Sequence, residues 1–212
     1  MRLVPSSLVL AGLVAVGLFT ASERAASAYD PNKWGAGATA YGYVVPDQPD
    51  FVMVVAPVDF RRLHLEGRYN YEGLHTGSVF VGLNAGTGDK LRLDATGMLG
   101  GVFGDLDGVA PAFRITLTWW KLDFSTESEY VIDVHDASAS FFYNWSELGI
   151  SPLRWLRLGT VVQRTRVVQT GLDLQRGLLA GVTLFEKMSL TFYELNLGWT
   201  TPTFIFSIGA SY

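Results

Sequence analysis

The residues best suited to chemistry are a histidine and a serine that lie close together in the chain. His135 and Ser138 are separated by two residues, and the carboxyl groups of Glu127, Glu129 and Asp133 precede them. A serine hydroxyl is a weak nucleophile until a neighbouring base takes its proton, and a third polar group commonly orients that base. The segment therefore permits hydrolysis of an acyl ester, with His135 and Ser138 as the candidate catalytic pair.

The position of this pair in the chain counts against catalysis. His135 and Ser138 fall at a predicted turn, and a turn does not hold two side chains in a fixed arrangement. We interpret both as exposed loop residues and favour a non-enzymatic protein. His64 belongs to a ladder of alternating polar residues and is interpreted as a paired interior side chain, whereas His75 falls in a predicted surface turn.

The sequence gives no indication of a metal, cofactor or nucleic-acid site. The 3 histidines are scattered, cysteine is absent, and no acidic cluster has zinc or calcium spacing. The glycine-rich stretches fall within predicted strands and hairpins rather than before a helix, so a phosphate-binding loop is not expected. The net charge is −4 and acidic residues accompany every group of lysines and arginines, which excludes a basic nucleic-acid surface. We expect neither a metal nor a cofactor.

The beginning of the chain has the features of a secretory signal peptide. Met1 and Arg2 form a weakly basic start, an apolar run extends from Leu8 to Phe19, and Ala26-Ser27-Ala28 is a cleavage site of small residues. The apolar run is shorter than the roughly 20 residues that a spanning helix needs. We expect residues 1–28 to be a signal peptide and residues 29–212 to form one domain.

From residue 62 onward, polar and apolar residues alternate. In the clearest segment, Leu63, Leu65 and Tyr69 share one face of an extended chain, and His64 and Glu66 share the other. A soluble sandwich would have to bury one polar face. A barrel in a membrane satisfies both faces, because the apolar one contacts lipid and the polar one lines an enclosed lumen.

The alternation predicts an all-β protein, a closed antiparallel transmembrane β-barrel. No later segment approaches 18 consecutive apolar residues, and closed barrels are the only alternative to helices in lipid, where every backbone group must be paired. Strands are predicted at 62–72, 77–85, 90–103, 110–119, 121–133, 138–148, 153–166, 172–185, 188–198 and 202–212. Residues 36–45 and 51–58 add a hairpin, so we favour about 12 strands; 10 strands with an N-terminal segment is the alternative.

Two details of this assignment can be tested by a structure. Tight periplasmic turns are predicted at 86–89, 149–152 and 186–187. The aromatic residues Phe141, Tyr143 and Trp145 are assigned to the lipid face of their strand, and Arg176 interrupts its strand pattern at a bulge or at an interfacial position.

The predicted inward faces carry many charged residues. The lumen-lining set comprises Arg62, His64, Glu66, Arg68, Arg92, Asp94, Arg114, Glu127, Glu129 and Arg157. With Lys90, Asp123, Asp133 and Asp173 included, the two signs nearly balance. A selective pore commonly has an excess of one sign along its path, whereas balanced charges in a narrow barrel can pair across it. We favour an interlocked salt-bridge network over a conducting channel.

The end of the chain carries the most specific pattern. Phe204, Phe206, Ile208, Ala210 and Tyr212 lie on one face of the last predicted strand. This face resembles the C-terminal β-signal of bacterial outer-membrane proteins, which the barrel-assembly machinery reads. The resemblance implies location in the bacterial outer membrane, contact with outer-membrane lipid, and the assembly machinery as a partner during biogenesis. We expect a monomer or weak oligomer.

Outer-membrane lipid A deacylases and phospholipases use a Ser–His pair, which is the basis of the hydrolase alternative. The segment from His135 to Ser138 lacks the His-x-Ser-Asn arrangement of those enzymes. The preferred function is therefore structural, or that of a narrow pore with a charge-networked lumen. A lipid acyl-ester hydrolase and a conducting small-solute channel are the alternatives.

Overall fold

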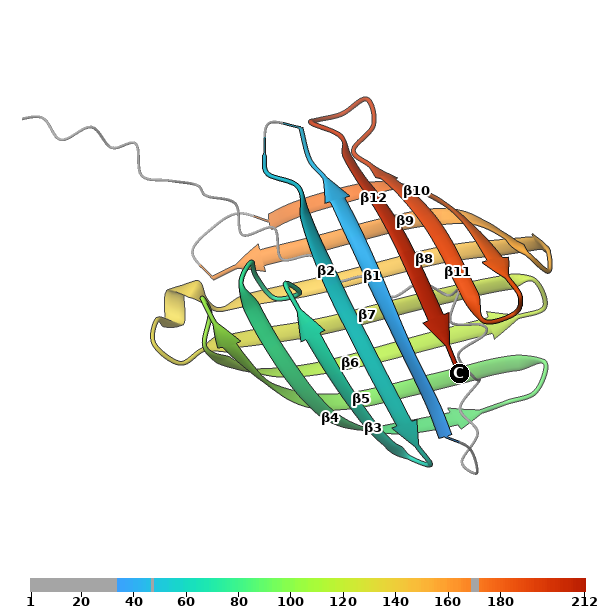
Figure 1. Ribbon diagram of the computed structural model, residues 1–212, viewed down its shortest axis with the longest axis horizontal. Helices are drawn as coiled ribbons and strands as arrows, with labels where there is room; N and C mark the ends of the chain where they lie inside the picture. Colours follow the sequence, from blue (N-terminus) through green and yellow to red (C-terminus); the bar gives the residue numbers. More distant parts are fainter. Residues whose placement is uncertain (1–33, 47, 169–171) are drawn as a thin grey trace, which may run out of the picture.

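The computed structural model describes residues 34–46, 48–168 and 172–212, and these form a closed barrel of twelve antiparallel strands (Figure 1). The predicted signal peptide lies outside the described residues. The strands are β1 (Trp34–Val44), β2 (Phe51–Phe60), β3 (Leu63–Tyr69), β4 (Thr76–Thr87), β5 (Leu91–Gly104), β6 (Gly108–Trp119), β7 (Leu122–Asp133), β8 (Phe141–Leu153), β9 (Leu156–Val167), β10 (Leu172–Leu184), β11 (Met188–Leu195) and β12 (Thr203–Ser211). The prediction of about 12 strands is confirmed.

Pairing between the first and last strands closes the barrel. Each strand is hydrogen-bonded to its neighbours in sequence, and β1 also pairs with β12, for example at Ala38 opposite Ala210 and Gly42 opposite Phe206. Every strand therefore has two partners, so the sheet has no open edge. This arrangement pairs the backbone groups without help from water, as a lipid environment requires.

The two ends of the barrel differ in their connections. The terminal end carries Trp34 and Ser211 and has tight turns at 61–62, 120–121 and 185–187. Arg61, Trp120 and Phe185 in these turns have positive φ angles of 54, 54 and 52°, and tight hairpins commonly require such angles. The opposite end, which we call the loop end, carries longer connections at 70–75, 134–140 and 196–202, among others.

The outer surface of the barrel is apolar along most strands. Exposed outward side chains include Leu65, Val79, Val81, Leu83, Leu91, Leu99, Phe113, Trp119, Leu158, Leu178, Phe206 and Ile208. Such a belt is unfavourable in water and suits contact with acyl chains. The period-2 alternation that the sequence showed thus separates a lipid-facing exterior from the interior.

In β8 the faces are opposite to those predicted. Phe141, Tyr143 and Trp145 are only 1, 2 and 1% exposed and point into the barrel. Asn144, between Tyr143 and Trp145, points outward, and its Nδ2 donates to Thr126 Oγ1 and to Ser128 Oγ of β7, each at 2.9 Å. The prediction was wrong because aromatic residues suit a filled interior as well as a lipid face.

The predicted turn at 149–152 was also placed too early. β8 continues to Leu153, with a register irregularity between Ile150 and Leu153. Pro152 lies inside this irregularity, where its missing N–H does not break a regular ladder. Ser151 N still donates to Lys121 O at 2.8 Å. The tight turn is formed instead by the next two residues, Arg154 and Trp155.

Candidate functional site: a charged cluster inside the barrel

Large side chains fill the interior of the barrel. Those with less than 2% of their surface exposed include Trp145, Tyr41, Tyr43, Tyr143, Tyr193, Phe80 and Phe141. Buried charged residues lie among them. In the described part of the chain, the lumen is therefore occupied by protein side chains and is not a wide aqueous channel.

Arg68 of β3 is at the centre of the larger charged group. Its Nε lies 2.5 Å from Glu66 Oε1, its Nη1 lies 2.6 Å from Glu129 Oε2, and its Nη2 lies 3.0 Å from Glu127 Oε1. Glu127 and Glu129 belong to β7, four strands away around the barrel. One guanidinium thus ties two separated strands together across the lumen.

Aromatic rings hold this guanidinium on two sides. Arg68 Cζ lies 4.0 Å from the centre of the Tyr71 ring and 4.1 Å from that of Phe80, within cation–π range. Gly100 makes room for Phe80, because a Cβ atom at Gly100 would lie 2.5 Å from the Phe80 ring. The missing side chain on β5 therefore allows the ring to lie flat against the wall.

Arg114 adds strand β6 to this group, and His64 links the group to Asp59 of β2. Arg114 of β6 places Nη2 3.0 Å from Glu66 Oε2 and Nε 3.1 Å from Glu127 Oε2. His64 Nδ1 lies 2.8 Å from Asp59 Oδ1 of β2, and its Nε2 lies 3.4 Å from Glu66 Oε2. We call Glu66, Arg68, Tyr71, Glu72, Arg114, Glu127 and Glu129, together with His64, the Arg68 cluster.

The connection between β3 and β4 adds two residues to the Arg68 cluster. The Tyr71 hydroxyl donates to Glu127 Oε1 at 2.6 Å, and Ser78 Oγ donates to Glu72 Oε1 at 2.7 Å. Tyr71 and Glu72 are 2 and 1% exposed, although they belong to a turn. Burial raises the pKa of the Glu72 carboxyl above its ordinary value, although Arg68 and Ser78 oppose the shift.

Asn70 shapes this inward-folded connection. Its φ is 55°, in the left-handed region that asparagine tolerates well. Its side chain accepts a hydrogen bond from His75 N at 2.8 Å and donates to Val52 O at 2.8 Å. Sequence reasoning missed Glu72 as an interior residue because alternation carries no information about side chains in a turn.

A second charged group, the Arg157 cluster, joins β7, β8, β9 and β11. Arg157 Nη2 lies 2.6 Å from Asp123 Oδ2, and Nη1 lies 2.7 Å from Glu147 Oε2. Trp145 Nε1 and the Tyr193 hydroxyl donate to Glu147 Oε1 at 2.9 and 3.2 Å. Sequence reasoning missed Glu147 because it shares a face with the aromatics of β8, which had been assigned to lipid.

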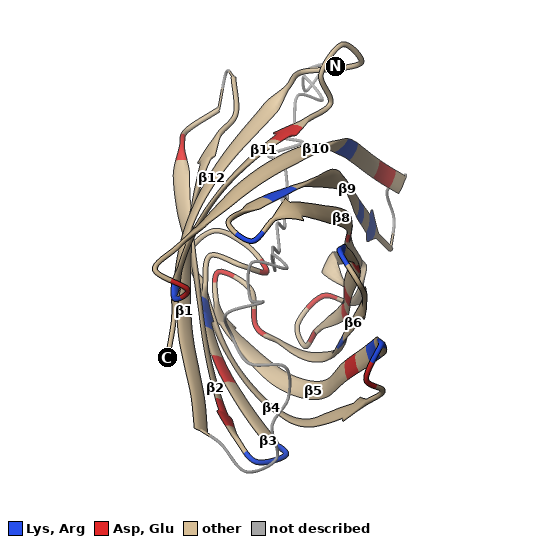
Figure 2. Cartoon of the chain, turned by 90° about the vertical axis from the view of Figure 1, so that its right-hand side faces the viewer, with Lys and Arg blue, Asp and Glu red and all other residues tan. Residues whose placement is uncertain are grey.

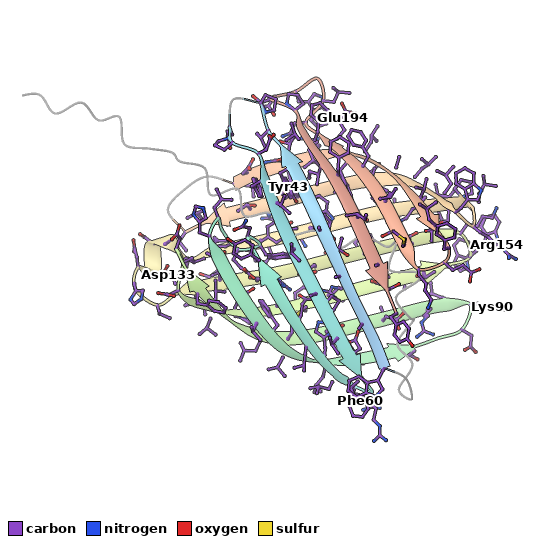
Figure 3. All side chains as sticks on the ribbon, in the orientation of Figure 1. Tyr43, Phe60, Lys90, Asp133, Arg154 and Glu194 are labelled. Carbon is purple, nitrogen blue, oxygen red and sulfur yellow. The ribbon has the colours of Figure 1, made fainter. Side chains whose placement is uncertain are left out.

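The buried charges do not balance. Glu66, Glu72, Asp123, Glu127, Glu129 and Glu147 are buried with Arg68 and Arg157, and Arg114 and His64 lie beside them. Among the described residues, Glu72 Oε2, Glu129 Oε1 and Asp123 Oδ1 are buried without a hydrogen-bond partner. The expected near balance was wrong, because Arg62 and Lys90 lie in exposed turns while Glu72 and Glu147 face inward. Figure 3 labels Lys90 in its turn at the edge of the barrel.

The other predicted lumen residues have different surroundings. Arg92 and Asp94 of β5 are half-buried and form an ion pair, with 2.8 Å between Arg92 Nε and Asp94 Oδ2. Arg62 is not in a strand, because β3 begins one residue later at Leu63. Within the described residues, no group of His, Asp or Glu has an arrangement that could hold a metal ion.

The structure does not bring His135 and Ser138 together as a catalytic pair. His135 Nε2 lies 3.3 Å from Asp107 Oδ2, whereas Ser138 Oγ donates to Asp136 Oδ1 at 2.6 Å. Ser138 belongs to a single helical turn, η2 (Ala137–Ala139), which Asp136 caps. The hydrogen bonds from Ser138 lower the pKa of Asp136. Within the described residues, no helix is long and apolar enough to cross a membrane.

The last strand has the geometry that the C-terminal pattern predicts. Phe206, Ile208, Ala210 and Tyr212 are exposed on the outer face with the partly buried Phe204, while Ile205 and Ser207 are buried inside. Recognition of this face by the barrel-assembly machinery stays a prediction.

Comparison with known proteins identifies the fold. No family model and no curated protein matches the sequence. Among solved structures, the KdgM porin is similar, with a TM-score of 0.58 and 8% identity over 83% of this chain and 98% of that chain. The KdgM porin in complex with disordered oligogalacturonate has a TM-score of 0.59, again with 8% identity, 83% of this chain and 98% of that chain.

The closed barrel, its apolar exterior and this likeness define the class of protein. The chain has the fold of the bacterial outer-membrane porins, and the resemblance inferred from the sequence is confirmed. It is a β-barrel protein of the bacterial outer membrane. At 8% identity the likeness concerns the fold and assigns no ligand.

Proposed function

We propose that the protein is a narrow, cation-preferring, non-enzymatic pore that the Arg68 cluster closes. The observation that carries this proposal is the excess of buried carboxyl groups in the Arg68 cluster, where four carboxyl groups accompany two guanidinium groups and one imidazole. Glu66, Glu127 and Glu129 all contact Arg68 within 3.0 Å, and Glu72 lies 3.6 Å away. An excess of one sign along the lumen is the usual basis of charge selectivity.

The position of the cluster supports its role as the closing element. Its side chains come from β3, β6, β7 and the connection after β3, so they converge from separated parts of the wall. The many partners of Arg68 keep it in place. Removal of this one cation would both open space and leave carboxyl groups facing it.

The lumen does not suit the ligand named for the similar structure. That KdgM porin was solved with oligogalacturonate, a chain of carboxylate-bearing sugars. Here the buried interior is rich in carboxyl groups, and like charges repel strongly where water is scarce. We therefore propose small cations or uncharged solutes, rather than polyanions, as what passes.

Planar-bilayer recording tests the proposal. Wild-type protein should show rare, small conductance steps, and the Arg68→Ala variant should conduct more often, with a reversal potential shifted towards that of the cation in a salt gradient. Arg154→Ala is the matched control, since Arg154 lies in an exposed turn at the terminal end (Figure 3). Its currents should equal those of wild type.

Two outcomes would contradict the pore. Silent membranes for both wild type and Arg68→Ala would indicate a purely structural barrel, provided that both proteins migrate as folded barrels in unheated gels. Anion preference of the opened variant would contradict the charge argument. The Arg68→Gln variant, which also removes the cation but keeps a polar side chain, serves if Arg68→Ala does not fold.

A further inference from the structure

Three arginines interrupt the apolar exterior of the barrel on two adjacent strands. Arg164 and Arg166 of β9 and Arg176 of β10 are exposed and lie on the outward face. Arg164 is opposite Leu174, Arg166 is opposite Leu172, and Arg176 is opposite Val162, so the three form a ladder near the loop end. Figure 2 shows basic segments of both strands side by side. We call these three residues the outer basic patch.

No ion pair among the described residues neutralises the patch. In the described part of the chain, no carboxylate forms an ion pair with any of the three arginines. Asp173 lies on the inner face of β10 and accepts from Gln175. Glu194, opposite the outward-facing Leu178, shares the outer face with Arg176 but forms no ion pair with it within the described residues, so the three arginines still outnumber the single carboxylate beside them. The patch is therefore a concentration of positive charge.

The height of the patch on the barrel places it at a boundary. Arg176 is level with the connection between β11 and β12, because Asn196 N donates to Arg176 O at 2.8 Å. Its guanidinium also lies 4.1 Å from the ring centre of Trp199 in that connection. Interfacial tryptophans mark the level of lipid headgroups.

The exterior changes in character at this level. Towards the terminal end, the outward residues of β9 and β10 are apolar except for Thr160: Leu156, Leu158, Val162, Leu178, Ala180, Val182 and Leu184. Beside the patch, the outward residues Asn144 and Ser146 of β8 extend the polar surface at the same level, with Asn144 opposite Arg164 and Ser146 opposite Val162. Acyl chains suit the apolar surface towards the terminal end, and a polar, negatively charged group suits the level of the three arginines.

We propose that the outer basic patch binds the phosphate-bearing headgroup of an anionic lipid of the surrounding membrane. Guanidinium groups match phosphate geometry and form charge-assisted hydrogen bonds with it. The apolar residues below the patch receive the acyl chains of the same molecule. The patch thus selects which lipids surround this side of the barrel, and it acts independently of the lumen.

Lipid retention measured by native mass spectrometry tests this proposal. Detergent-solubilised protein is mixed with phosphatidylglycerol or with phosphatidylcholine. The phosphate of phosphatidylglycerol carries an uncompensated negative charge, whereas the choline cation neutralises the phosphate charge of phosphatidylcholine. Wild type should prefer phosphatidylglycerol. The variant Arg164→Gln/Arg166→Gln/Arg176→Gln should bind it at least about tenfold more weakly, since charge-assisted bonds to phosphate are lost. Arg154→Gln, an exposed arginine at the terminal end, is the matched control and should bind as wild type does.

Several results would overturn the proposal. Equal retention of the two lipids would contradict it, and so would undiminished phosphatidylglycerol binding by the triple variant. Full competition by inorganic phosphate, at the same phosphate concentration as the lipid, would indicate a simple anion site. Dimers in wild type that the triple variant lacks would assign the patch to contact between copies of the chain. Folding of each variant is checked by its heat-dependent gel mobility, and unchanged bilayer conductance separates this test from that of the pore.

Discussion

Arg68 and Glu129 are 61 residues apart in the chain, yet Arg68 Nη1 lies 2.6 Å from Glu129 Oε2 inside the barrel. The two residues come from β3 and β7, which have three strands between them along the wall. Both side chains are essentially inaccessible to solvent. Buried charges of this kind depend on their partners, so the cluster fixes the positions of its members more than it adds net stability.

Arg68→Ala should destabilise the barrel strongly. Loss of one partner leaves buried carboxyl groups uncompensated, and such losses cost about 3–5 kcal/mol. Arg92→Ala is the control, because the Arg92–Asp94 pair is half-exposed and such pairs contribute about 1 kcal/mol or less. Denaturant unfolding in detergent micelles measures both values. Equal losses in the two variants would contradict the special role of the Arg68 cluster.

Tyr71→Phe should weaken the inward-folded connection without disturbing its packing. The substitution removes only the hydroxyl that donates to Glu127 Oε1 at 2.6 Å. Hydrogen bonds to charged groups contribute about 1.5–3 kcal/mol, so the free energy of unfolding should fall by that amount. Tyr130→Phe, on the outward face of β7 with 40% exposure, is the control and should have little effect. An equal loss of unfolding free energy in both variants would show that the hydrogen bond from the Tyr71 hydroxyl to Glu127 makes no special contribution.

Glu72→Gln should change how stability depends on pH. Burial raises the pKa of Glu72 in the folded protein. The unfolded chain therefore releases this proton at lower pH than the folded protein, so the free energy of unfolding falls as pH rises through the ordinary glutamate range towards the raised value. Glutamine cannot ionise, and the variant should lack this part of the decline.

Unfolding curves between about pH 4 and 9 measure the difference between the two proteins. Wild type should lose stability relative to Glu72→Gln as pH rises, and the two should converge at the acidic end. Glu186→Gln, in the exposed turn after β10, is the control and should follow wild type throughout. A parallel profile for Glu72→Gln and wild type would mean that Glu72 does not titrate differently on folding.

Sequence alone predicts strands well where one face is polar throughout. In β3, Leu63 and Leu65 alternate with His64 and Glu66, and only one orientation satisfies both sets in a membrane barrel. The twelve strands follow from such segments and from the glycine, asparagine and proline residues between them. Pairing in register then follows from chain order, because adjacent strands are joined by short connections.

The interior could not be predicted to the same degree. Phe141, Tyr143 and Trp145 of β8 are suited to either face of the barrel wall, because the lumen is itself filled by aromatic rings. Glu147 was not recognised as an interior residue, because it shares a face with these aromatics. Glu72 was not recognised because it lies in a turn, where alternation gives no information. The near balance of charges was therefore miscounted, because which charges face inward depends on contacts between distant strands.

Gly177→Ala should disrupt the pairing of β10 with β11. A Cβ atom at Gly177 would lie only 1.8 Å from the backbone oxygen of Glu194, which cannot move without shifting its strand. Overpacking of this kind costs about 1–3 kcal/mol. Gly97→Ala on β5 is the control, because no heavy atom lies within 4 Å of its added Cβ. Thermal unfolding should separate the two, and equal midpoints would contradict the close approach at Gly177.

Fluorescence quenching should confirm the orientation of β8. Trp145 is 1% exposed and points into the barrel, whereas Trp119 is 56% exposed on the outer face of β6. Single-tryptophan proteins, in which the other tryptophans are replaced by phenylalanine, are reconstituted into membranes containing brominated lipid. Because this quenching requires close approach to the acyl chains, it should be strong for Trp119 and weak for Trp145. Strong quenching of both would mean that the aromatic face of β8 contacts lipid, and the Arg157 cluster would then lose the hydrogen bond from Trp145 to Glu147.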